Sequence, residues 1–342
     1  MNPYESNYLN ELISNSKQIE AHCIIDNHIY GISDICLNNQ NKDILAASSF
    51  DSTISLYDLN TTKEISLLKG HSKGVWTINY QPKSNLLLSG GSDYISYLWD
   101  TSSNKQISKF EIHKNNIYDV QFSQQGNLFA TCSKDCICIW DMKNMNKPID
   151  LIKESKGELK DFIYCCNFLE DEEHLLTGFI DGSLIIHKLH NKLENDTLIN
   201  IPAQVKFGKD SDDVYNKSIF GIEFLNKQKN LFLLTHSDGS VRVYKYNKDK
   251  NNVSLIDKYY YFTDAVTYAQ TNENDTKIIA SSKDRTGEIW EYGNHSKISY
   301  SLIGHKNVVS SALFYGNNKA ITSSFDNTVR IWNVPDEMGD VI

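Results

Sequence analysis

Histidine, aspartate and cysteine side chains that could do chemistry recur along this chain. His71 directly follows a glycine and could act as a general base, as could other histidines placed in the same way. Cys132, Cys136 and Cys138 stand close together in the sequence, as zinc ligands often do. The run Gly90-Gly91-Ser92 is glycine-rich, as phosphate-binding loops are. Each of these chemistries requires partner residues at a defined spacing.

The partner residues do not stand at the required spacing. No second pair of Cys or His lies at zinc spacing from Cys136, and Cys132 and Cys138 fall inside strand-like runs, which favours cysteines buried in the core. No Gly-Lys-Ser/Thr sequence follows Gly91, so the glycines indicate a turn. We therefore expect no metal, no cofactor and no catalytic residues.

The stretch from Gly70 to Asp100 shows which elements position these residues. Three short runs of β-branched, aromatic and other apolar residues are separated by turns, which predicts strands rather than helices. His71 stands just before one run and Asp93 just before another, so a hydrogen bond between their side chains can tie two strand ends together. Trp99 offers a large ring and one N–H donor to complete this network.

The turn aspartate of this stretch recurs along nearly the whole chain, with gaps of 42, 42, 46, 57, 46 and 42 residues. Its copies are Asp51, Asp93, Asp135, Asp181, Asp238, Asp284 and Asp326. Trp99 follows its aspartate by six residues, whereas the third copy reaches Trp140 after only five and has therefore lost one residue. Repetition at such a period indicates stacked repeats, each one small unit of structure.

Gly-His, Asp and Trp-Asp at these intervals resemble the WD40 repeat, and seven copies cover about residues 17–334. The resemblance implies an all-β fold, a seven-bladed WD40 β-propeller. It also implies that the repeated His, Asp and Trp residues tie strands together and are not catalytic. These structural residues are His28, His71, His113, His305, Asp51, Asp93, Asp135, Asp326, Trp99, Trp140 and Trp332.

The two ends of the chain stand outside the repeat. Residues 1–16 form an N-terminal extension with apolar residues at helical spacing, which indicates either a short amphipathic helix or a frayed tail. Residues 17–334 form a single propeller. Because the last copy ends its third strand at Val334, we expect Lys17–Ile25 to supply the missing strand and close the ring. Residues 335–342 form a C-terminal tail.

The longest gap between copies contains an inter-blade insertion, residues 188–217, which is polar and includes Asp210, Asp212 and Asp213. Either residues 197–201 or residues 203–207 are expected to form the outer strand of the fourth blade, and the remainder a surface loop. That loop is either an acidic docking segment or a solvated insertion.

Charge and composition exclude several classes of partner. The 34 basic and 43 acidic residues give a net charge of −9, which argues against direct nucleic-acid binding. No apolar run is long enough to span a membrane, and no signal peptide begins the sequence. The seven cysteines, an odd number, suit a reducing compartment, so we expect a cytoplasmic or nuclear location.

In the family that this chain resembles, partners bind on the face where the loops before the first strands open. The second residue of each first strand is expected to point at that face, and in four consecutive blades it is aromatic. Phenylalanines precede two of the turn aspartates, and the loops on this face carry lysines. The expected partner-binding residues are Trp76, Tyr118, Tyr164, Phe220, Phe50, Phe325, Lys73, Lys114, Lys134 and Lys283. Rigid aromatic side chains favour an interaction hot spot.

These observations predict a non-enzymatic scaffold or adaptor that binds protein or peptide partners, among them anionic or phosphorylated segments, as a monomeric propeller within a multiprotein complex. One alternative is a substrate receptor of a ubiquitin ligase. Such receptors often end a blade with Trp-Asp-x-Arg, whereas Trp99 and the other blade-end tryptophans here are not followed by that arginine. The other alternative is an ester hydrolase similar to the WD40 diphthine methylesterase, which would show turnover and depend on a nucleophile.

Overall fold

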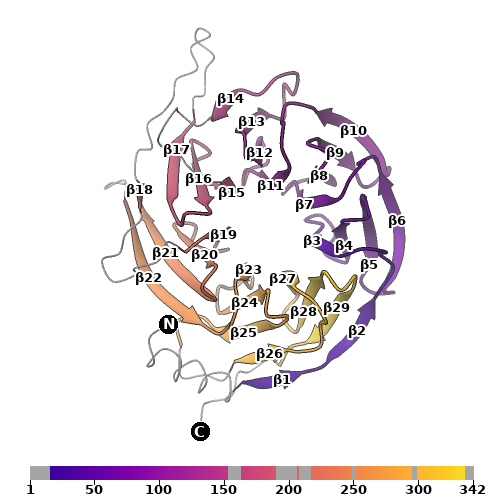
Figure 1. Cartoon of the computed structure of the whole chain (residues 1–342), viewed down its shortest axis with the longest axis vertical. Helices are drawn as coiled ribbons and strands as arrows, with labels where there is room; N and C mark the ends of the chain where they lie inside the picture. Colours follow the sequence, from indigo (N-terminus) through magenta and orange to yellow (C-terminus); the bar gives the residue numbers. More distant parts are fainter. Residues whose placement is uncertain are drawn as a thin grey trace. The chain divides into compact units, whose positions relative to one another are not determined.

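The computed structural model describes residues 16–152, 163–189, 206–207, 217–248, 252–294 and 299–335. All regular elements among these residues are β-strands, arranged in seven sheets of four or five strands. The sheets are the blades of a β-propeller (Figure 1), which confirms the predicted fold class. Within the described residues, no helix is long and apolar enough to cross a membrane. The chain divides into two compact units, residues 33–222 and residues 1–32 with 223–342.

The unit of residues 33–222 contains four sheets. The first consists of β3 (Ile32–Leu37), β4 (Ile44–Ser49), β5 (Thr53–Asp58) and β6 (Lys63–Lys69). The second consists of β7 (Val75–Tyr80), β8 (Leu86–Gly91), β9 (Ser96–Asp100) and β10 (Lys105–Phe110). The third consists of β11 (Ile117–Phe122), β12 (Leu128–Ser133), β13 (Ile137–Asp141) and β14 (Asp150–Ile152). The fourth consists of β15 (Ile163–Phe168), β16 (His174–Phe179), β17 (Leu184–Lys188) and β18 (Lys206–Phe207). The first strands β7, β11 and β15 lie against one another (Figure 1).

The remaining three sheets belong mostly to the other unit, which consists of residues 1–32 and 223–342. The fifth blade consists of β19 (Ile219–Phe224), which spans the boundary between the units, β20 (Leu231–His236), β21 (Ser240–Asn247) and β22 (Asn252–Tyr260). The sixth consists of β23 (Val266–Thr271), β24 (Lys277–Ser282), β25 (Gly287–Glu291), β26 (Tyr300–Leu302) and β1 (Lys17–Ile19). The seventh consists of β27 (Val309–Tyr315), β28 (Lys319–Ser324), β29 (Val329–Asn333) and β2 (Ala21–Ile25).

An N-terminal strand completes the seventh blade, as predicted. β2 pairs antiparallel with β29, so the hydrogen-bonding edge of β29 is covered. The predicted strand Lys17–Ile25 is wrong in its first part, however. Lys17–Ile19 forms the separate strand β1, which pairs in parallel with β26 and makes the sixth blade five-stranded. The N-terminal segment therefore joins two neighbouring blades of the same unit.

The turn after the repeated aspartate uses a left-handed backbone conformation in six of the seven blades. Tyr94 and Asn327, which follow the aspartates of the second and seventh blades, both have a φ of 70°. In the third blade Asp135 is followed directly by Cys136, and the Ser133 amide donates to the Cys136 carbonyl at 3.0 Å. The residue missing from the third copy is therefore the left-handed one, in the turn between β12 and β13.

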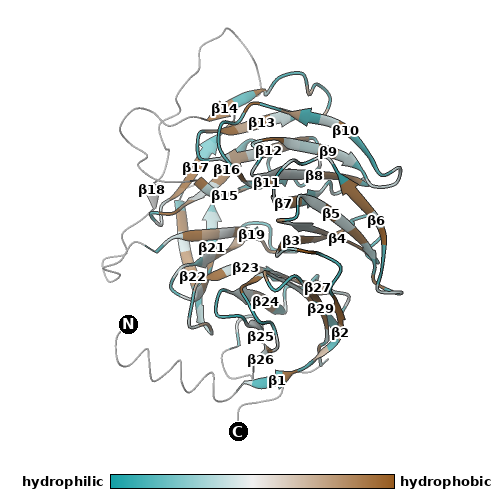
Figure 2. Cartoon of the chain, turned by 45° about the vertical axis from the view of Figure 1, so that its right-hand side comes forward, coloured by the Kyte–Doolittle hydropathy of each residue, from teal (hydrophilic) through white to brown (hydrophobic). Residues whose placement is uncertain are grey.

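The core of the 33–222 unit lies between neighbouring sheets. Leu56 of the first blade packs in one buried cluster with Val75, Leu87 and Trp99 of the second. The strands carry most of the apolar residues and the connecting loops are mostly hydrophilic (Figure 2). This distribution follows from alternation along each strand, which directs every second side chain into the space between blades.

Several expectations fall on residues outside the described part of the chain. These are the helix or tail of residues 1–16 (of which Ser16 alone is described), most of the 188–217 insertion and the tail after Pro335. Within the insertion β18 pairs with β17, through Phe207 and Leu184. The outer strand of the fourth blade therefore lies in the second of the two predicted segments, residues 203–207.

Candidate protein-interaction surface

The second residue of the first strand forms a β-bulge in several blades. In the second blade Val75 pairs with Gly91 and Thr77 with Gly90, so the ladder passes over Trp76. The same shift in register passes over Tyr118, Tyr164, Thr267 and Ser310. A bulge turns a side chain away from the regular alternation of the strand. These are the positions that the sequence predicted to point at the partner-binding face.

Five aromatic rings of the 33–222 unit form one continuous row, which we call the aromatic row: Phe50, Trp76, Tyr118, Tyr164 and Phe220. The ring centroids of consecutive members lie 4.8, 5.9, 5.7 and 5.0 Å apart in that order. Tyr118 and Tyr164 are stacked, and both terminal pairs meet edge to face. These arrangements are the favourable ones for aromatic rings. All five residues are half-buried.

Local contacts fix the start of the aromatic row. The Trp76 indole Nε1 donates to Ser92 Oγ at 2.7 Å. A Cβ on Gly74 would lie 3.0 Å from Phe50 Cδ1, so glycine allows this close approach. The sequence pattern predicted that Ser92 faces the partner-binding side but gave it no role in binding, and it did not single out Gly74. Ser92 directly precedes the turn aspartate, and Gly74 directly precedes the first strand.

Burial also sets the chemistry of one ring in the row. It raises the pKa of the Tyr164 phenol from 10.0 to about 12, so this hydroxyl, which is uncharged at pH 7 even without the shift, stays protonated in more alkaline solution. The row is therefore an apolar and hydrogen-bonding surface, without negative charge of its own.

Small hydroxyl residues take the bulge position or its equivalent in three other blades. Ser33 Oγ donates to the Val75 carbonyl at 2.6 Å, and Thr267 Oγ1 donates to the Val309 carbonyl at 2.6 Å. Ser310 likewise donates to a backbone carbonyl, at 2.7 Å. These residues join the first strands of successive blades and add no apolar surface for a partner.

Phe325, the remaining aromatic residue predicted for the surface, belongs to the other unit. It is half-buried, and its amide donates to the Val308 carbonyl at 2.9 Å. A Cβ on Gly31 would lie 2.9 Å from Phe325 Cα, so this pair repeats the close contact between Gly74 and Phe50.

The four predicted lysines are exposed, and three of them belong to the 33–222 unit. Lys73 Nζ lies 5.3 Å from the centre of the Tyr94 ring. Lys114 directly follows the network histidine of the third blade, and Lys134 directly precedes Asp135. The fourth, Lys283, lies in the other unit. Lys73 and Lys114 thus lie in the loops that precede the first strands β7 and β11, and Lys134 lies in the turn between β12 and β13.

The predicted structural network is present in the second blade. His71 Nδ1 lies 3.0 Å from Asp93 Oδ1, and His71 Nε2 lies 2.8 Å from Ser89 Oγ. Trp99 Nε1 donates to the same Ser89 Oγ at 2.8 Å. Burial raises the pKa of Asp93, but hydrogen bonds from His71 and from the Ser72 amide outweigh it and hold this pKa below its ordinary value. Asp93 is therefore ionised at neutral pH and holds the histidine in place.

Ser89, His71 and Asp93 are connected by hydrogen bonds in the order of a Ser-His-Asp catalytic triad. Ser89, however, is not accessible to a substrate. Ser89 is fully buried, and its hydroxyl oxygen already accepts the Trp99 N–H. A serine nucleophile must reach the carbonyl carbon of the substrate while the histidine accepts its proton. Ser89 cannot do so, and the arrangement serves to tie strands together.

The seventh blade repeats the network with Asp326. His305 Nδ1 lies 3.0 Å from Asp326 Oδ2, His305 Nε2 lies 2.7 Å from Thr322 Oγ1, and Trp332 Nε1 donates to Thr322 at 2.8 Å.

The fourth blade has His187 at the tryptophan position. Its Nε2 lies 2.9 Å from Thr177 Oγ1, and burial lowers the His187 pKa to about 4, so the ring is neutral. His28 is buried, and Asp51 accepts hydrogen bonds from Thr53.

Four segments of the chain match the sequence model of the family described as WD domain, G-beta repeat. They are residues 17–58, 62–100, 104–141 and 296–333. The chain carries WD40 repeats. Each matched repeat ends with the last residue of a third strand, namely β5, β9, β13 or β29. A WD40 repeat therefore contains the outer strand of one blade and the three inner strands of the next, and the first repeat supplies β2 to the seventh blade.

Several WD-repeat and other proteins are similar to parts of this chain. Protein SPA1-RELATED 4 of Arabidopsis thaliana is 34% identical over 62 residues, which are 18% of this chain and 8% of that protein. SIR4-interacting protein SIF2 of Saccharomyces cerevisiae is 25% identical over 113 residues, 33% of this chain and 20% of that protein. WD repeat-containing protein 37 of Homo sapiens is 29% identical over 70 residues, 20% of this chain and 14% of that protein. The matches thus span a fifth or less of these relatives.

Proposed function

We propose that this WD40 protein is a non-enzymatic scaffold that binds peptide segments of partner proteins across the aromatic row, as one subunit of a multiprotein assembly. The observation that supports this proposal most strongly is the unbroken contact between the rings of Phe50, Trp76, Tyr118, Tyr164 and Phe220. The row belongs to one compact unit, so its geometry does not depend on how the two units are placed.

A surface of this kind favours binding for two reasons. Aromatic side chains bury a large area with few rotatable bonds, and they are enriched among the residues that contribute most to interfaces. The bulges and the bond from Trp76 to Ser92 hold the rings before a partner arrives. A preformed surface loses less conformational entropy on binding than a mobile one.

The exposed lysines favour an anionic or phosphorylated segment. Lys73, Lys114 and Lys134 adjoin the second and third blades of the row, and the turn positions before the aspartates include no acidic residue. Exposed charges contribute mainly to the rate and selectivity of association, whereas the rings supply most of the affinity. We further propose a cytoplasmic or nuclear location, which the seven free cysteines favour.

The two alternative functions have weaker support. The blade ends lack the Trp-Asp-x-Arg sequence of many ubiquitin-ligase receptors. The buried Ser89 hydroxyl argues against its use as the nucleophile of an ester hydrolase.

The proposal can be tested with an array of acidic peptides, each present with and without phosphoserine or phosphothreonine. Peptides that bind the wild-type chain are then titrated against Trp76→Ala and Tyr164→Ala, each checked for folding by circular dichroism. We expect each substitution to weaken binding by about 2 kcal/mol or more, as for a central hot-spot residue. Ile107→Ala, at a half-exposed apolar position on the outer strand β10, is the matched control. Binding that survives both ring substitutions but is lost on changing an outer strand would place the surface elsewhere.

A further inference from the structure

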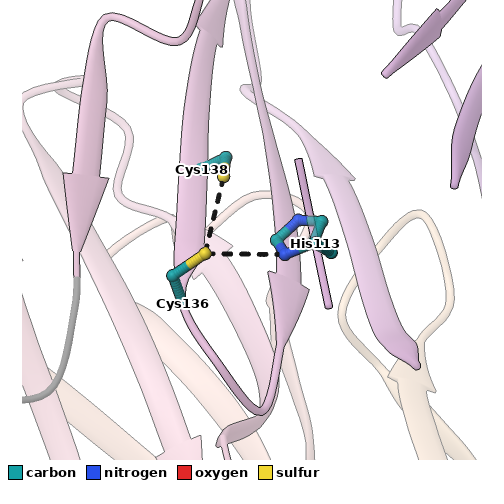
Figure 3. Close-up of side chains that lie close together, drawn as sticks. All are labelled: His113, Cys136 and Cys138. Carbon is teal, nitrogen blue, oxygen red and sulfur yellow. Dashed lines mark hydrogen bonds between the residues drawn. The ribbon is translucent and has the colours of Figure 1, made fainter. Parts of the chain in front are cut away.

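The third blade replaces the usual histidine–aspartate contact with a cluster of sulfur, nitrogen and oxygen atoms. His113 precedes β11, Asp135 and Cys136 form the shortened turn after β12, and Cys138 lies in β13 (Figure 3). The His113 Nδ1–Asp135 Oδ1 distance is 3.7 Å. In the second blade the corresponding atoms of His71 and Asp93 are 3.0 Å apart.

Three of the contacts in this cluster share the Cys136 sulfur atom. Cys136 Sγ lies 3.6 Å from His113 Nδ1 and 3.8 Å from Cys138 Sγ (Figure 3). It also lies 3.5 Å from Asp135 Oδ2. The possible ligand atoms of His113, Cys136 and Cys138 all lie within 4.8 Å of one another. The cluster thus offers two thiols, one imidazole nitrogen and one carboxylate oxygen.

Two of these separations match two edges of a zinc-centred tetrahedron. Zinc bonds of about 2.3 Å to sulfur and about 2.0–2.1 Å to nitrogen place two sulfurs about 3.8 Å apart, and a sulfur and a nitrogen about 3.6 Å apart. The measured distances between Cys136 and its neighbours Cys138 and His113 are 3.8 and 3.6 Å. His113, Cys136 and Cys138 therefore offer three ligand atoms that one zinc ion could draw together, and Asp135, which adjoins two of them, could supply the fourth.

Groups behind the ligand atoms hold them in position. His113 Nε2 lies 2.8 Å from Thr131 Oγ1, and the Ser133 hydroxyl donates to Asp135 at 2.6 Å. A histidine that binds zinc through one ring nitrogen is typically oriented by a hydrogen bond at the other. Cys136 and Cys138 are buried, whereas the Asp135 side chain is 23% exposed and leaves an approach from solvent.

Other blades provide an internal comparison. In the second blade Ile95 and Tyr97 take the places of the two cysteines, and in the seventh blade Thr328 and Arg330 do so. The seventh blade also keeps its His–Asp distance at 3.0 Å. Among the described blades, a shortened turn, a separated His–Asp pair and two convergent thiols occur together in the third.

We propose that His113, Asp135, Cys136 and Cys138 form a structural zinc site. Binding would convert both thiols to thiolates and release two protons to water, with the imidazole neutral and the carboxylate ionised. Four protein ligands would fill the tetrahedron, which is the arrangement of a structural site rather than a catalytic one. The sequence spacing led us to expect no metal, and this proposal departs from that expectation. β-sheet pairing brings His113 next to Cys136, which lies 23 residues further along the chain.

The full chain, purified in reductant without a metal-binding tag, tests the proposal. We expect about one zinc per chain by mass spectrometry of the metal content, since the four residues form a single site. After removal of zinc, cobalt(II) should produce a thiolate-to-cobalt charge-transfer band and the visible bands of tetrahedral cobalt. Cys136→Ser and Cys138→Ser should lose the charge-transfer intensity, whereas Cys36→Ser, a half-buried cysteine of the same unit, should retain it.

A second variant guards against loss of signal through misfolding. Thr131→Val keeps all four ligands and should weaken zinc binding about 10–100-fold, as expected for loss of an orienting hydrogen bond. Reduced, folded protein that retains no zinc and gives no cobalt–thiolate band would overturn the proposal. So would a cobalt spectrum that Cys136→Ser and Cys138→Ser leave unchanged. A Cys136–Cys138 disulfide in metal-free protein that cannot be loaded after reduction would assign the pair to redox chemistry instead.

Discussion

Trp76 and Ser92 are joined by a hydrogen bond of 2.7 Å from the indole Nε1 to the serine hydroxyl, and Ser92 directly precedes Asp93. Asp93 in turn holds His71, whose Nδ1 lies 3.0 Å away. The aromatic row and the structural network of the second blade thus meet in one turn. The repeat that stabilises the blade also orients the first large ring of the proposed binding surface.

Replacing Ser92 by alanine should weaken peptide binding without unfolding the blade. The indole loses one hydrogen bond, which contributes about 0.5–1.5 kcal/mol, and because Trp76 is half-buried its N–H can still meet water. We expect a smaller loss of affinity than for Trp76→Ala, measured by titration with the peptides selected above. The exposed Ser72, in the loop between β6 and β7, provides a matched Ser→Ala control in the same blade region. Unchanged affinity in Ser92→Ala would show that this bond does not position the ring.

Reversing the charge of Lys134 should act on the association rate. Lys134→Glu places a negative charge beside the turn of the third blade, where an anionic peptide would approach. We expect slower association at low salt, little change in dissociation, and loss of the difference near 1 M salt, where the screening length falls to about 3 Å. Stopped-flow fluorescence measures both rates. Lys105→Glu, at the start of the outer strand β10, makes the same change in net charge. Equal slowing by both variants would indicate an effect of net charge alone.

The sequence predicted the blades and most of the aromatic row for a physical reason. The turn aspartates set the period, and this period places Trp76, Tyr118 and Tyr164 at the same second position of their first strands, where the bulges lie. The contact between Tyr118 and Tyr164 could not be predicted in the same way, because it depends on how two blades pack. The short strand β1 was missed because three residues carry no signal for parallel pairing.

Removing β2 should destabilise the unit that contains the seventh blade. Deletion of residues 1–25 would expose the β29 edge that β2 covers and promote aggregation. Deletion of residues 1–14 keeps β1 and β2 and should leave the melting temperature nearly unchanged. Scanning calorimetry and light scattering would compare the two truncations. Normal melting of a monomeric 26–342 chain would contradict the role of β2 in completing the blade.

Glu288 makes the stability of the sixth blade depend on pH. Its side chain is buried in β25 and accepts a hydrogen bond from Ser301. Burial raises the pKa of Glu288 from 4.5 to about 8, although the hydrogen bond from Ser301 opposes this shift.

Folding therefore takes up a proton between these two pH values. The folded chain keeps Glu288 protonated over this range, whereas the unfolded chain ionises above pH 4.5. The contribution of this carboxyl to stability is fully present below pH 4.5 and is lost as the pH rises towards 8, at up to about 1.4 kcal/mol per pH unit. Glu288→Gln is neutral at every pH and removes this dependence.

We expect Glu288→Gln to unfold at higher denaturant concentration than the wild type at pH 7.5, with a smaller difference at pH 5. Urea titrations at several pH values measure the change in unfolding free energy. The exposed Glu111→Gln, which removes a carboxyl from the surface of the other unit, is the control and should leave the slope with pH almost unaltered. A wild-type slope that survives in Glu288→Gln would mean that another group takes up the proton. Asp119 is then the next residue to replace, because burial raises its pKa to about 7.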